Sequence, residues 1–325
     1  MRREVRVRAN LIADLVISAV NKVFVIEVKA TANAPGVLMA TRQVQQYAAA
    51  IRRHSVPLVA VPFMGEVGRC ICEQEGVGWF DLSGNAHIVA PGIRVIVEGK
   101  PNRFKMAGRP PNLFAPKSSR IVRWLLIHAG EHINQREISR ATGLDEGFVS
   151  RLVARLEKED YIVRDEHGGV CAKDPALLLD AWRDAYQFSK HTLHQGHVAA
   201  RSGDVLLRFI CDSLAEQKLE HATTGLAAAW ALTRFAAFRI VTVYLLTDPS
   251  PALIERLGYR EDTRGANLWL VVPNDEGVFQ GAVEKDGVRC VSPVQVYVDL
   301  KDHPERSSEA AVRLRSELLT WRRDG

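Results

Sequence analysis

The sequence predicts a multidomain protein with an N-terminal α/β part, a small central helical part that ends in a hairpin, and a C-terminal α+β part. The 325 residues suit two or three domains rather than one. Apolar residues recur with strand and helix periods in separate blocks, and the Pro-rich stretch MAGRPPNLFAPKSS divides the first block from the second. We place the parts at residues 1–100, 117–173 and 174–325, with a basic Pro-rich linker at 101–116.

The composition is that of a globular protein with ordinary cores, since 47% of the residues are hydrophobic and 25% are charged. Every long apolar run is broken by a charged residue or His, which argues against a membrane span, and Asp14 interrupts the only segment that resembles a leader. Five cysteines in mostly apolar surroundings favour a reducing compartment, so we expect a cytoplasmic protein. Cys70 and Cys72 are interpreted as half-buried strand residues rather than zinc ligands.

The distribution of charge is more informative than its sum. The net charge is +5, which is a modest signal for this length. However, the stretch from Gly99 to Gly130 holds seven basic residues and no acidic one. Such a stretch favours a polyanion over a merely solvated linker. The seven are Lys100, Arg103, Lys105, Arg109, Lys117, Arg120 and Arg123.

In the first part, strand patterns at 11–20 and 22–31 predict a hairpin with its turn near Asn21 and Lys22. A helix is predicted at 35–53, a buried strand at 56–63, and further strands at 79–99 around a Ser83-Gly84-Asn85 turn. Asp81 precedes that turn and is interpreted as a turn former rather than as a metal ligand. This order predicts an α/β core with helices packed on a mixed sheet.

Three charged residues of the predicted hairpin could form a site. Glu27 and Lys29 share one face of their strand, and pairing of the two strands brings Asp14 close to Glu27. Two carboxylates can hold Mg²⁺, and the lysine can orient water or offset developing phosphate charge. The alternative is a cross-strand ion pair on a solvated face.

This arrangement, an Asp followed by Glu-x-Lys in a Val/Ile strand, resembles the PD-(D/E)XK or restriction-endonuclease-like superfamily, over about 90 residues. The segment Gln43-Val-Gln-Gln-Tyr47 resembles the QxxxY element of several of its branches. The resemblance implies metal-binding roles for Asp14 and Glu27, a catalytic role for Lys29, and supporting roles for Gln43 and Tyr47. It implies Mg²⁺ as a cofactor only if the site is competent. The sequence departs from the pattern in two respects: Ala13 replaces the usual Pro, and only 13 residues precede Asp14.

The central part shows three helical patterns and then a hairpin. The first helix is expected to be capped by Ser118 or Ser119, the second by Asn134 and the third by Asp145, and Gly143 is expected to end the second helix. Two short strands should flank the turn at 167–169. Helix, short helix, turn, longer helix and β-wing is the winged helix-turn-helix order.

A helix that lies in a major groove needs an apolar inner stripe and polar or basic outer residues. The inner stripe of the third helix is Phe148, Val149, Leu152, Val153 and Leu156. The segment at 133–164 resembles the winged-helix domains of bacterial transcription regulators. The residues predicted to contact DNA are Gln135, Arg136 and Arg140 of the second helix, Ser150, Arg151 and Arg155 of the third, and Arg164 and His167 of the wing.

The C-terminal part mixes helical patterns with strand patterns at 239–246, 266–273 and 291–301. His191, His194 and His197 are interpreted as solvated helix residues rather than as a metal site. The strand pattern at 239–246 carries no acid, which argues against nucleotidyl transfer. Three segments, 223–232, 266–273 and 291–319, together resemble the C-terminal region of AbiEi-type antitoxins of type IV toxin–antitoxin systems.

Three functions remain open from the sequence. The leading hypothesis is a DNA-binding, winged-helix transcription regulator of antitoxin-like type, whose expected partner is double-stranded DNA and whose candidate protein partners are a second copy of the chain and a cognate toxin. The second is a Mg²⁺-dependent DNA endonuclease that is guided by its winged helix. The third is a protein-interaction module without DNA binding. None of the three hypotheses includes a membrane as a partner.

Overall fold

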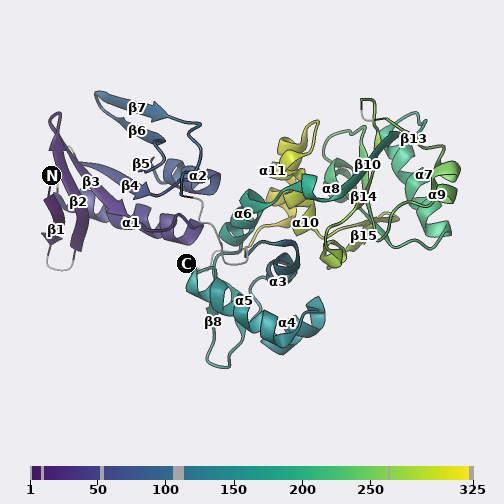
Figure 1. Cartoon of the computed structure of the whole chain (residues 1–325), viewed down its shortest axis with the longest axis horizontal. Coiled ribbons are helices and arrows are strands. Elements are labelled where there is room, and N and C mark those ends of the chain that lie inside the picture. Colours follow the sequence, from purple (N-terminus) through teal and green to yellow (C-terminus); the bar gives the residue numbers. More distant parts are fainter. Residues whose placement is uncertain (1, 9–10, 52–54, 105–112, 263, 322–325) are drawn as a thin grey trace. The chain divides into compact units, whose positions relative to one another are not determined.

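The computed structural model describes residues 2–8, 11–51, 55–104, 113–262 and 264–321. It divides into two compact units, residues 1–111 with 156–161 and residues 112–155 with 162–325 (Figure 1). Lys105 and Arg109 of the basic stretch lie outside the described residues.

The first unit is built on a seven-stranded mixed sheet whose strands follow chain order. β1 to β3 are antiparallel, β3 to β5 are parallel, and β5 to β7 are antiparallel again. The strands are β1 (Arg2–Arg8), β2 (Leu11–Ala19), β3 (Lys22–Val28), β4 (Ser55–Val61), β5 (Gly78–Asp81), β6 (Ala86–Ala90) and β7 (Ile93–Val97).

Two helices form the crossovers between the parallel strands of this sheet. They are α1 (Ala34–Ile51), between β3 and β4, and α2 (Glu66–Gln74), between β4 and β5. Right-handed crossovers between neighbouring parallel strands place both helices on the same face of the sheet, and α1 and α2 do contact each other. The opposite face carries an apolar cluster of Ile26, Val56, Leu58 and Ala60, with partly buried apolar neighbours around it.

Most predicted elements of the first unit are confirmed. The β2–β3 turn consists of Val20 and Asn21, both with positive φ, as a tight two-residue hairpin turn requires. Asp81 accepts hydrogen bonds from the backbone N–H and the side-chain amide of Asn85, which confirms its role in the turn. The prediction for the cysteine pair was wrong, because Cys70 and Cys72 lie on α2, where only Cys72 faces the core.

The second unit begins with a winged helix. Its elements are α3 (Pro116–Ile127), α4 (Gln135–Thr142), α5 (Glu146–Lys158), β8 (Ile162–Arg164) and β9 (Val170–Ala172). The expected cap of the first helix was wrong: the N-cap is Ala115, three residues before Ser118, and Pro116 lies in the first turn of α3. Proline fits there because the first helical N–H groups have no partner within the helix. Ser119 instead donates its hydroxyl to the carbonyl of Pro116.

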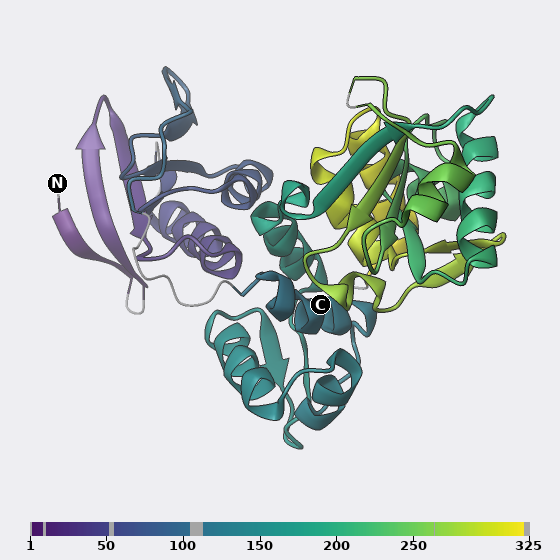
Figure 2. The same cartoon turned by 45° about the vertical axis from the view of Figure 1, so that its right-hand side comes forward.

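The rest of the second unit is a seven-stranded mixed sheet in the order β13-β10-β14-β12-β11-β16-β15. Figure 2 shows helices on both faces of this sheet. The strands are β10 (Thr192–His197), β11 (His221–Thr224), β12 (Val241–Leu245), β13 (Arg260–Glu261), β14 (Leu268–Val272), β15 (Val283–Lys285) and β16 (Val288–Cys290). The helices are α6 (Pro175–Ala185), α7 (Gly203–Glu216), α8 (Gly225–Thr233), α9 (Pro251–Leu257), α10 (Pro293–Asp299) and α11 (Ser307–Leu318), with short 3₁₀ turns at Phe188–Lys190, Glu276–Phe279 and Leu300–Asp302.

Two sequence predictions fail in this domain. The pattern at 291–301 is not a strand but helix α10, which Ser292 caps by accepting the N–H of Gln295 at 3.3 Å. Its alternating Val residues suggested a strand, whereas burial on all sides stabilises the helix. The three histidines are not helical: His194 and His197 lie on strand β10, and His191 is buried just before it.

Among the described residues, no helix is both long and apolar enough to cross a bilayer. All five cysteines are free thiols.

Candidate nucleic-acid interface

The helix-turn-helix is fixed by local capping. The Asn134 side chain accepts the N–H of Glu137 at 2.9 Å at the start of α4. Gly143 ends that helix with a φ of 65°, a left-handed conformation that glycine adopts without strain. Asp145 then accepts the N–H of Phe148 at 2.8 Å and begins α5. These three caps confirm the sequence prediction and set the angle between α4 and α5.

The wing is held by a single carboxylate. Asp165 accepts the N–H groups of His167 and Gly169 at 2.9 and 2.8 Å through one oxygen, which closes the turn between β8 and β9. Ile133 adds a backbone bridge to Val170, which ties the start of the helix-turn-helix to the wing. The two N–H bonds keep the pKa of Asp165 below its ordinary value, although burial opposes them. The wing therefore has a defined shape without a large core of its own.

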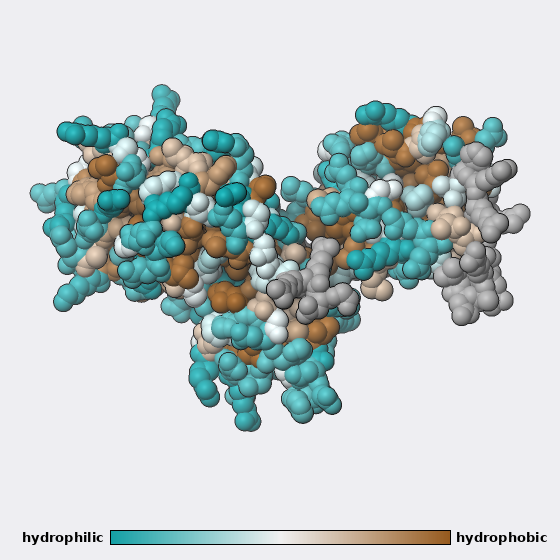
Figure 3. All heavy atoms as spheres, turned by 180° about the vertical axis from the view of Figure 1, so that it is seen from behind, coloured by the Kyte–Doolittle hydropathy of each residue, from teal (hydrophilic) through white to brown (hydrophobic). Residues whose placement is uncertain are grey.

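The outer surface of this domain is polar and basic. Arg136, Arg140, Ser150 and Arg151 are exposed, and Figure 3 shows hydrophilic residues over the tip of the winged helix. In the described part of the chain, Arg136, Arg140 and Arg151 form no ion pair, so their charges are not neutralised within the protein.

The other predicted contact residues are placed as follows. Gln135 is half-buried at the start of α4, and Arg155 is half-buried on α5. Arg164 and His167 are exposed on the wing, where Arg164 donates to the carbonyl of Gly168 at 3.1 Å. The acids Asp145 and Glu146 are exposed at the start of α5, where their charge is favourable to the helix terminus.

Two arginines of the basic stretch do not face a polyanion, which corrects the sequence interpretation. Arg120 binds the carboxylate of Asp275 through two bonds of 2.8 Å, and it also contacts Glu276. Arg123 is fully buried and donates to the Gln295 side-chain oxygen at 2.7 and 3.0 Å. Both residues extend from α3 into the C-terminal domain, so they hold the winged helix against it.

The N-terminal residues singled out in the sequence come together on the first unit. Lys29 donates to Glu27 at 2.8 Å and to Gln43 of α1 at 3.0 Å. Asp14 lies beside Glu27, since the adjacent Leu15 pairs with Ile26, and Asp14 accepts the N–H of Val28 at 2.8 Å. Asp14, Glu27 and Lys29 thus lie at one end of the β2–β3 hairpin, beside Gln43 of α1.

Glu27 is electrostatically unusual in this group. It is 6% exposed, and one of its carboxylate oxygens is buried without a hydrogen-bond partner in the structure. Burial raises its pKa above the ordinary value, and the nearby Asp14 adds to the increase, while Lys29 opposes both. The buried Tyr47 phenol likewise has a raised pKa, from burial first and then from Glu27 and Asp14. Among the described residues, no group of three or more His, Cys, Asp or Glu side chains is arranged to hold a metal ion.

The C-terminal domain contains a buried polar cluster that was not predicted from the sequence. The fully buried Asp299 accepts from Tyr186 at 2.5 Å and Gln295 at 2.7 Å through one oxygen, and from Thr224 at 2.5 Å and Tyr244 at 3.1 Å through the other. Gln295 also accepts from Arg123, so the cluster reaches the winged helix. Burial raises the pKa of Asp299 to about 6, against the four hydrogen bonds that lower it.

His191 completes this cluster. Its Nδ1 accepts the backbone N–H of Asn274 at 3.1 Å, so a neutral ring carries its proton on Nε2, which faces the hydroxyls of Tyr186 and Tyr244 at 2.7 and 3.2 Å. Burial, and then the Arg123 charge, lower the pKa of His191 to about 4. The sequence signal for this cluster was the pair Gln295 and Asp299 within the mostly apolar run VQVYVD.

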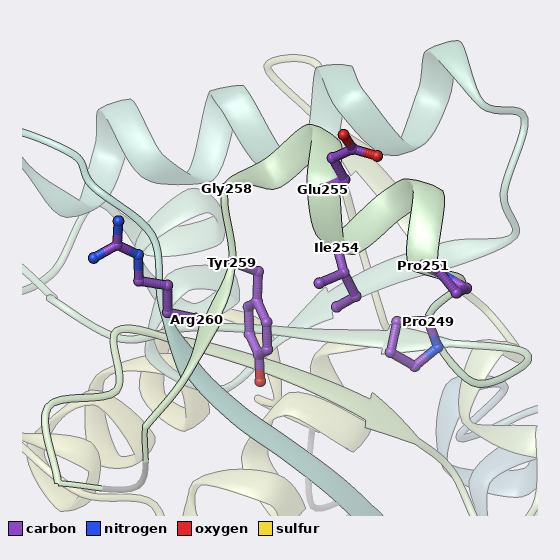
Figure 4. A pocket seen from close by; sticks show the side chains of 7 residues that line it. All are labelled: Pro249, Pro251, Ile254, Glu255, Gly258, Tyr259 and Arg260. Atoms are coloured by element: carbon purple, nitrogen blue, oxygen red, sulfur yellow. The ribbon is translucent and has the colours of Figure 1, made fainter.

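A cavity of about 570 Å³ lies alongside α9 and is lined by Pro249, Pro251, Ile254, Glu255, Gly258, Tyr259 and Arg260. Figure 4 shows the charged ends of Glu255 and Arg260 pointing away from each other. Ligand sites place a few polar groups so that they converge on one molecule. This lining does not do so, and the cavity is not our candidate site.

Two family models match the chain. Residues 115–169 match the MarR family. Residues 172–320 match the family described as transcriptional regulator, AbiEi antitoxin, type IV TA system. No significant match was found among curated proteins or among solved structures. The two matches meet at the end of the wing and leave residues 1–114 outside.

These matches agree with the geometry of the second unit, in which a winged helix is joined by α3 to an α+β domain. Together they support a DNA-binding transcriptional regulator of antitoxin-like type.

Proposed function

We propose that this chain represses or activates transcription by placing α5 in the major groove of duplex DNA, with α4 and the wing against the flanking phosphates. The observation that carries the proposal is that the arginines of this region fall into two groups, those bound to partners within the second unit and those exposed without an ion pair. Arg120 and Arg123 bind Asp275 and Gln295 within the second unit. In contrast, three arginines of α4 and α5 are exposed without an ion-pair partner among the described residues: Arg136, Arg140 and Arg151. Positive charge left unpaired on one surface is what phosphate binding requires.

The residues divide between two tasks. Arg136 and Arg140 on α4 fit phosphate contacts, which fix the register of the protein on the duplex. Ser150 and Arg151 lie in the first turns of α5, the part of a recognition helix that reaches base edges. We therefore expect α5 to determine the sequence preference and α4 to determine much of the affinity.

The test is a gel shift with footprinting on the DNA upstream of the chain's own coding sequence. We expect a protected site for the parent protein. A variant with Arg136, Arg140 and Arg151 all replaced by Ala should lose it, while Arg208→Ala, an exposed arginine of α7, should keep it. Absence of a shift with any duplex at low salt would contradict the proposal.

The name of the second matched family also suggests a protein partner. We propose that the C-terminal domain binds a cognate toxin, as that name implies for its members. Co-purification of the full chain with the product of a neighbouring gene, retained when the three arginines are replaced, would support this role. A chain that binds DNA but retains no such product would contradict it.

A second function, divalent-metal-dependent cleavage of DNA, rests on the N-terminal constellation. The residues that would hold such an ion are Asp14 and Glu27, which offer two hard oxygen ligands from adjacent strands, and one Glu27 oxygen is buried without a partner. Mg²⁺, when bound, would activate water. Lys29, held by Glu27 and Gln43, would place its positive charge beside a scissile phosphate.

This second function is tested by incubating supercoiled DNA with the full chain and Mg²⁺ or Mn²⁺. Cleavage that disappears in Glu27→Ala/Lys29→Ala, but persists in a Glu73→Gln control on the exposed side of α2, would support it. DNA binding without cleavage would leave the regulator as the function, with the N-terminal fold as a second module.

A further inference from the structure

The last strand of the N-terminal sheet has an unpaired edge. β7 forms a hairpin with β6, from Ala90 paired with Ile93 to Ala86 paired with Val97. On its other side, β7 pairs with no strand in the described part of the chain. A free strand edge presents a row of backbone donors and acceptors that can pair with another strand.

The hairpin turn determines which backbone groups face outward. Only Pro91 and Gly92 separate Ala90 from Ile93, so this pair exchanges both of its backbone hydrogen bonds. In an antiparallel ladder, the direction of these groups alternates. The N–H and C=O groups of Arg94 and Ile96 therefore point away from β6, as do those of Glu98 if the strand continues by one residue.

The edge strand combines two exposed charged residues, Arg94 and Glu98, with exposed apolar ones. Val95 and Ile96 are 41% and 43% exposed, and Val89 of the adjacent strand is 58% exposed. They lie on both faces of the hairpin, because Val95 and Ile96 are neighbours in one strand. Figure 3 shows hydrophobic surface over the top of the first unit, where the hairpin lies.

We propose that β7 pairs antiparallel with β7 of a second copy of this chain, about a two-fold axis at Ile96. This register places Ile96 opposite its own copy, and its outward backbone groups then bond reciprocally. It also places Arg94 of each copy opposite Glu98 of the other, so two ion pairs flank the axis. On the other face, Val95 meets Val97.

Charge complementarity selects this register and this partner. A register centred one residue earlier, on Val95, would place Arg94 opposite Ile96 and leave both charges unpaired. A strand that is complementary to itself in charge and in shape fits an isologous two-fold contact, the commonest symmetry of protein oligomers. The apolar face of each sheet, with Ile26 and Leu58 at its centre, also becomes continuous across the axis.

This inference goes beyond the proposed function and does not depend on it. A dimer would carry two winged helices, and two linked DNA contacts bind more tightly than one. The dimer itself is measured without DNA, so failure of the dimer and failure of DNA binding are separate results.

The first test is sedimentation equilibrium of the full chain over a concentration series, for the parent and for Ile96→Pro. Proline removes only an outward-facing N–H, so the β6–β7 ladder keeps its hydrogen bonds. We expect a concentration-dependent dimer for the parent and a monomer with unchanged circular dichroism for the variant. A monomeric parent at every concentration, or a dimer that Ile96→Pro leaves intact, would overturn the proposal.

The second test exchanges charges. R94E and E98R should each weaken the dimer by at least tenfold in dissociation constant, because each places like charges opposite one another at two positions. The double variant R94E/E98R restores opposite charges and should dimerise like the parent. Single variants without effect, or a double variant no better than either single one, would overturn the register and with it the proposal.

Discussion

Two buried carboxylates of this protein have opposite surroundings. Asp299, in the C-terminal domain, accepts four hydrogen bonds, two at each oxygen, from side chains of helix α10, of strands β11 and β12, and of the segment after α6. Glu27, in the N-terminal sheet, has one ion pair at one oxygen and no partner at the other. Both have a raised pKa, and in both the main cause is burial.

The difference separates a structural group from a candidate functional one. A buried acid with every lone pair satisfied stabilises one arrangement of the elements around it. A buried acid with an orphaned oxygen costs stability, and such a cost persists in proteins mainly where a ligand or a reaction uses the group. The comparison therefore predicts that substitutions at the two positions will have effects of very different size.

The largest effect is expected from Asp299→Ala. The substitution leaves four donors without an acceptor in a buried site, and losing one member of such a network costs about 3–5 kcal/mol of unfolding free energy. Chemical denaturation of the full chain measures it. Asp302→Ala, an exposed acid three residues later, is the control and should change stability by less than about 0.5 kcal/mol. Equal effects of the two variants would contradict the structural role of Asp299.

The next effect is a pH dependence. The folded-state pKa of Asp299 is about 6, above its ordinary 3.8, so acidification through this window favours the folded state. The folded-state pKa of His191 is about 4, below its ordinary 6.5, so the same acidification favours the unfolded state. The two contributions have opposite signs and similar size, and they nearly cancel in the parent.

Replacing either residue should reveal the pH dependence of stability that the other one contributes. Relative to the parent, His191→Asn should gain about 3 kcal/mol of unfolding free energy as the pH falls from about 6.5 to about 4, and Asp299→Asn should lose a similar amount between about 6 and about 4. Denaturation at a series of pH values measures both differences. Curves that remain parallel to the parent's would show that neither group titrates as its burial requires.

The smallest effect is expected at Glu27. Replacing it by Gln removes a desolvated charge but also weakens the contact with Lys29, so the unfolding free energy should stay within about 1 kcal/mol of the parent value. The same denaturation experiment measures it. A loss as large as that of Asp299→Ala would make Glu27 a structural residue and would remove the basis of the second proposed function.

The sequence predicted the features that depend on contacts between residues close together in the chain. Asn134, Gly143 and Asp145 cap their helices through groups within four residues, so the pattern alone located the helix-turn-helix. The proximity of Asp14 and Glu27 followed from one hairpin and its alternation. Each of these predictions needed only a short segment of chain.

The failures concern contacts between residues distant in sequence. Arg120 and Arg123 lie in a basic stretch without acids, but their partners are Asp275 and Gln295, more than 150 residues away. The α10 segment has the alternation of a strand and becomes a helix because it is buried on all sides. Tertiary packing decides such cases, and no pattern within a short window contains it.

The most direct test of the central claim is the salt dependence of DNA affinity, measured by fluorescence anisotropy on the footprinted duplex. For the parent, affinity should fall steeply with salt, and each lost phosphate contact should reduce the slope by about 0.9. We predict that Arg136→Ala and Arg140→Ala each lower both affinity and slope, while Arg208→Ala changes neither. If all four proteins gave the same affinity and the same slope, the winged helix would not be the surface that binds DNA.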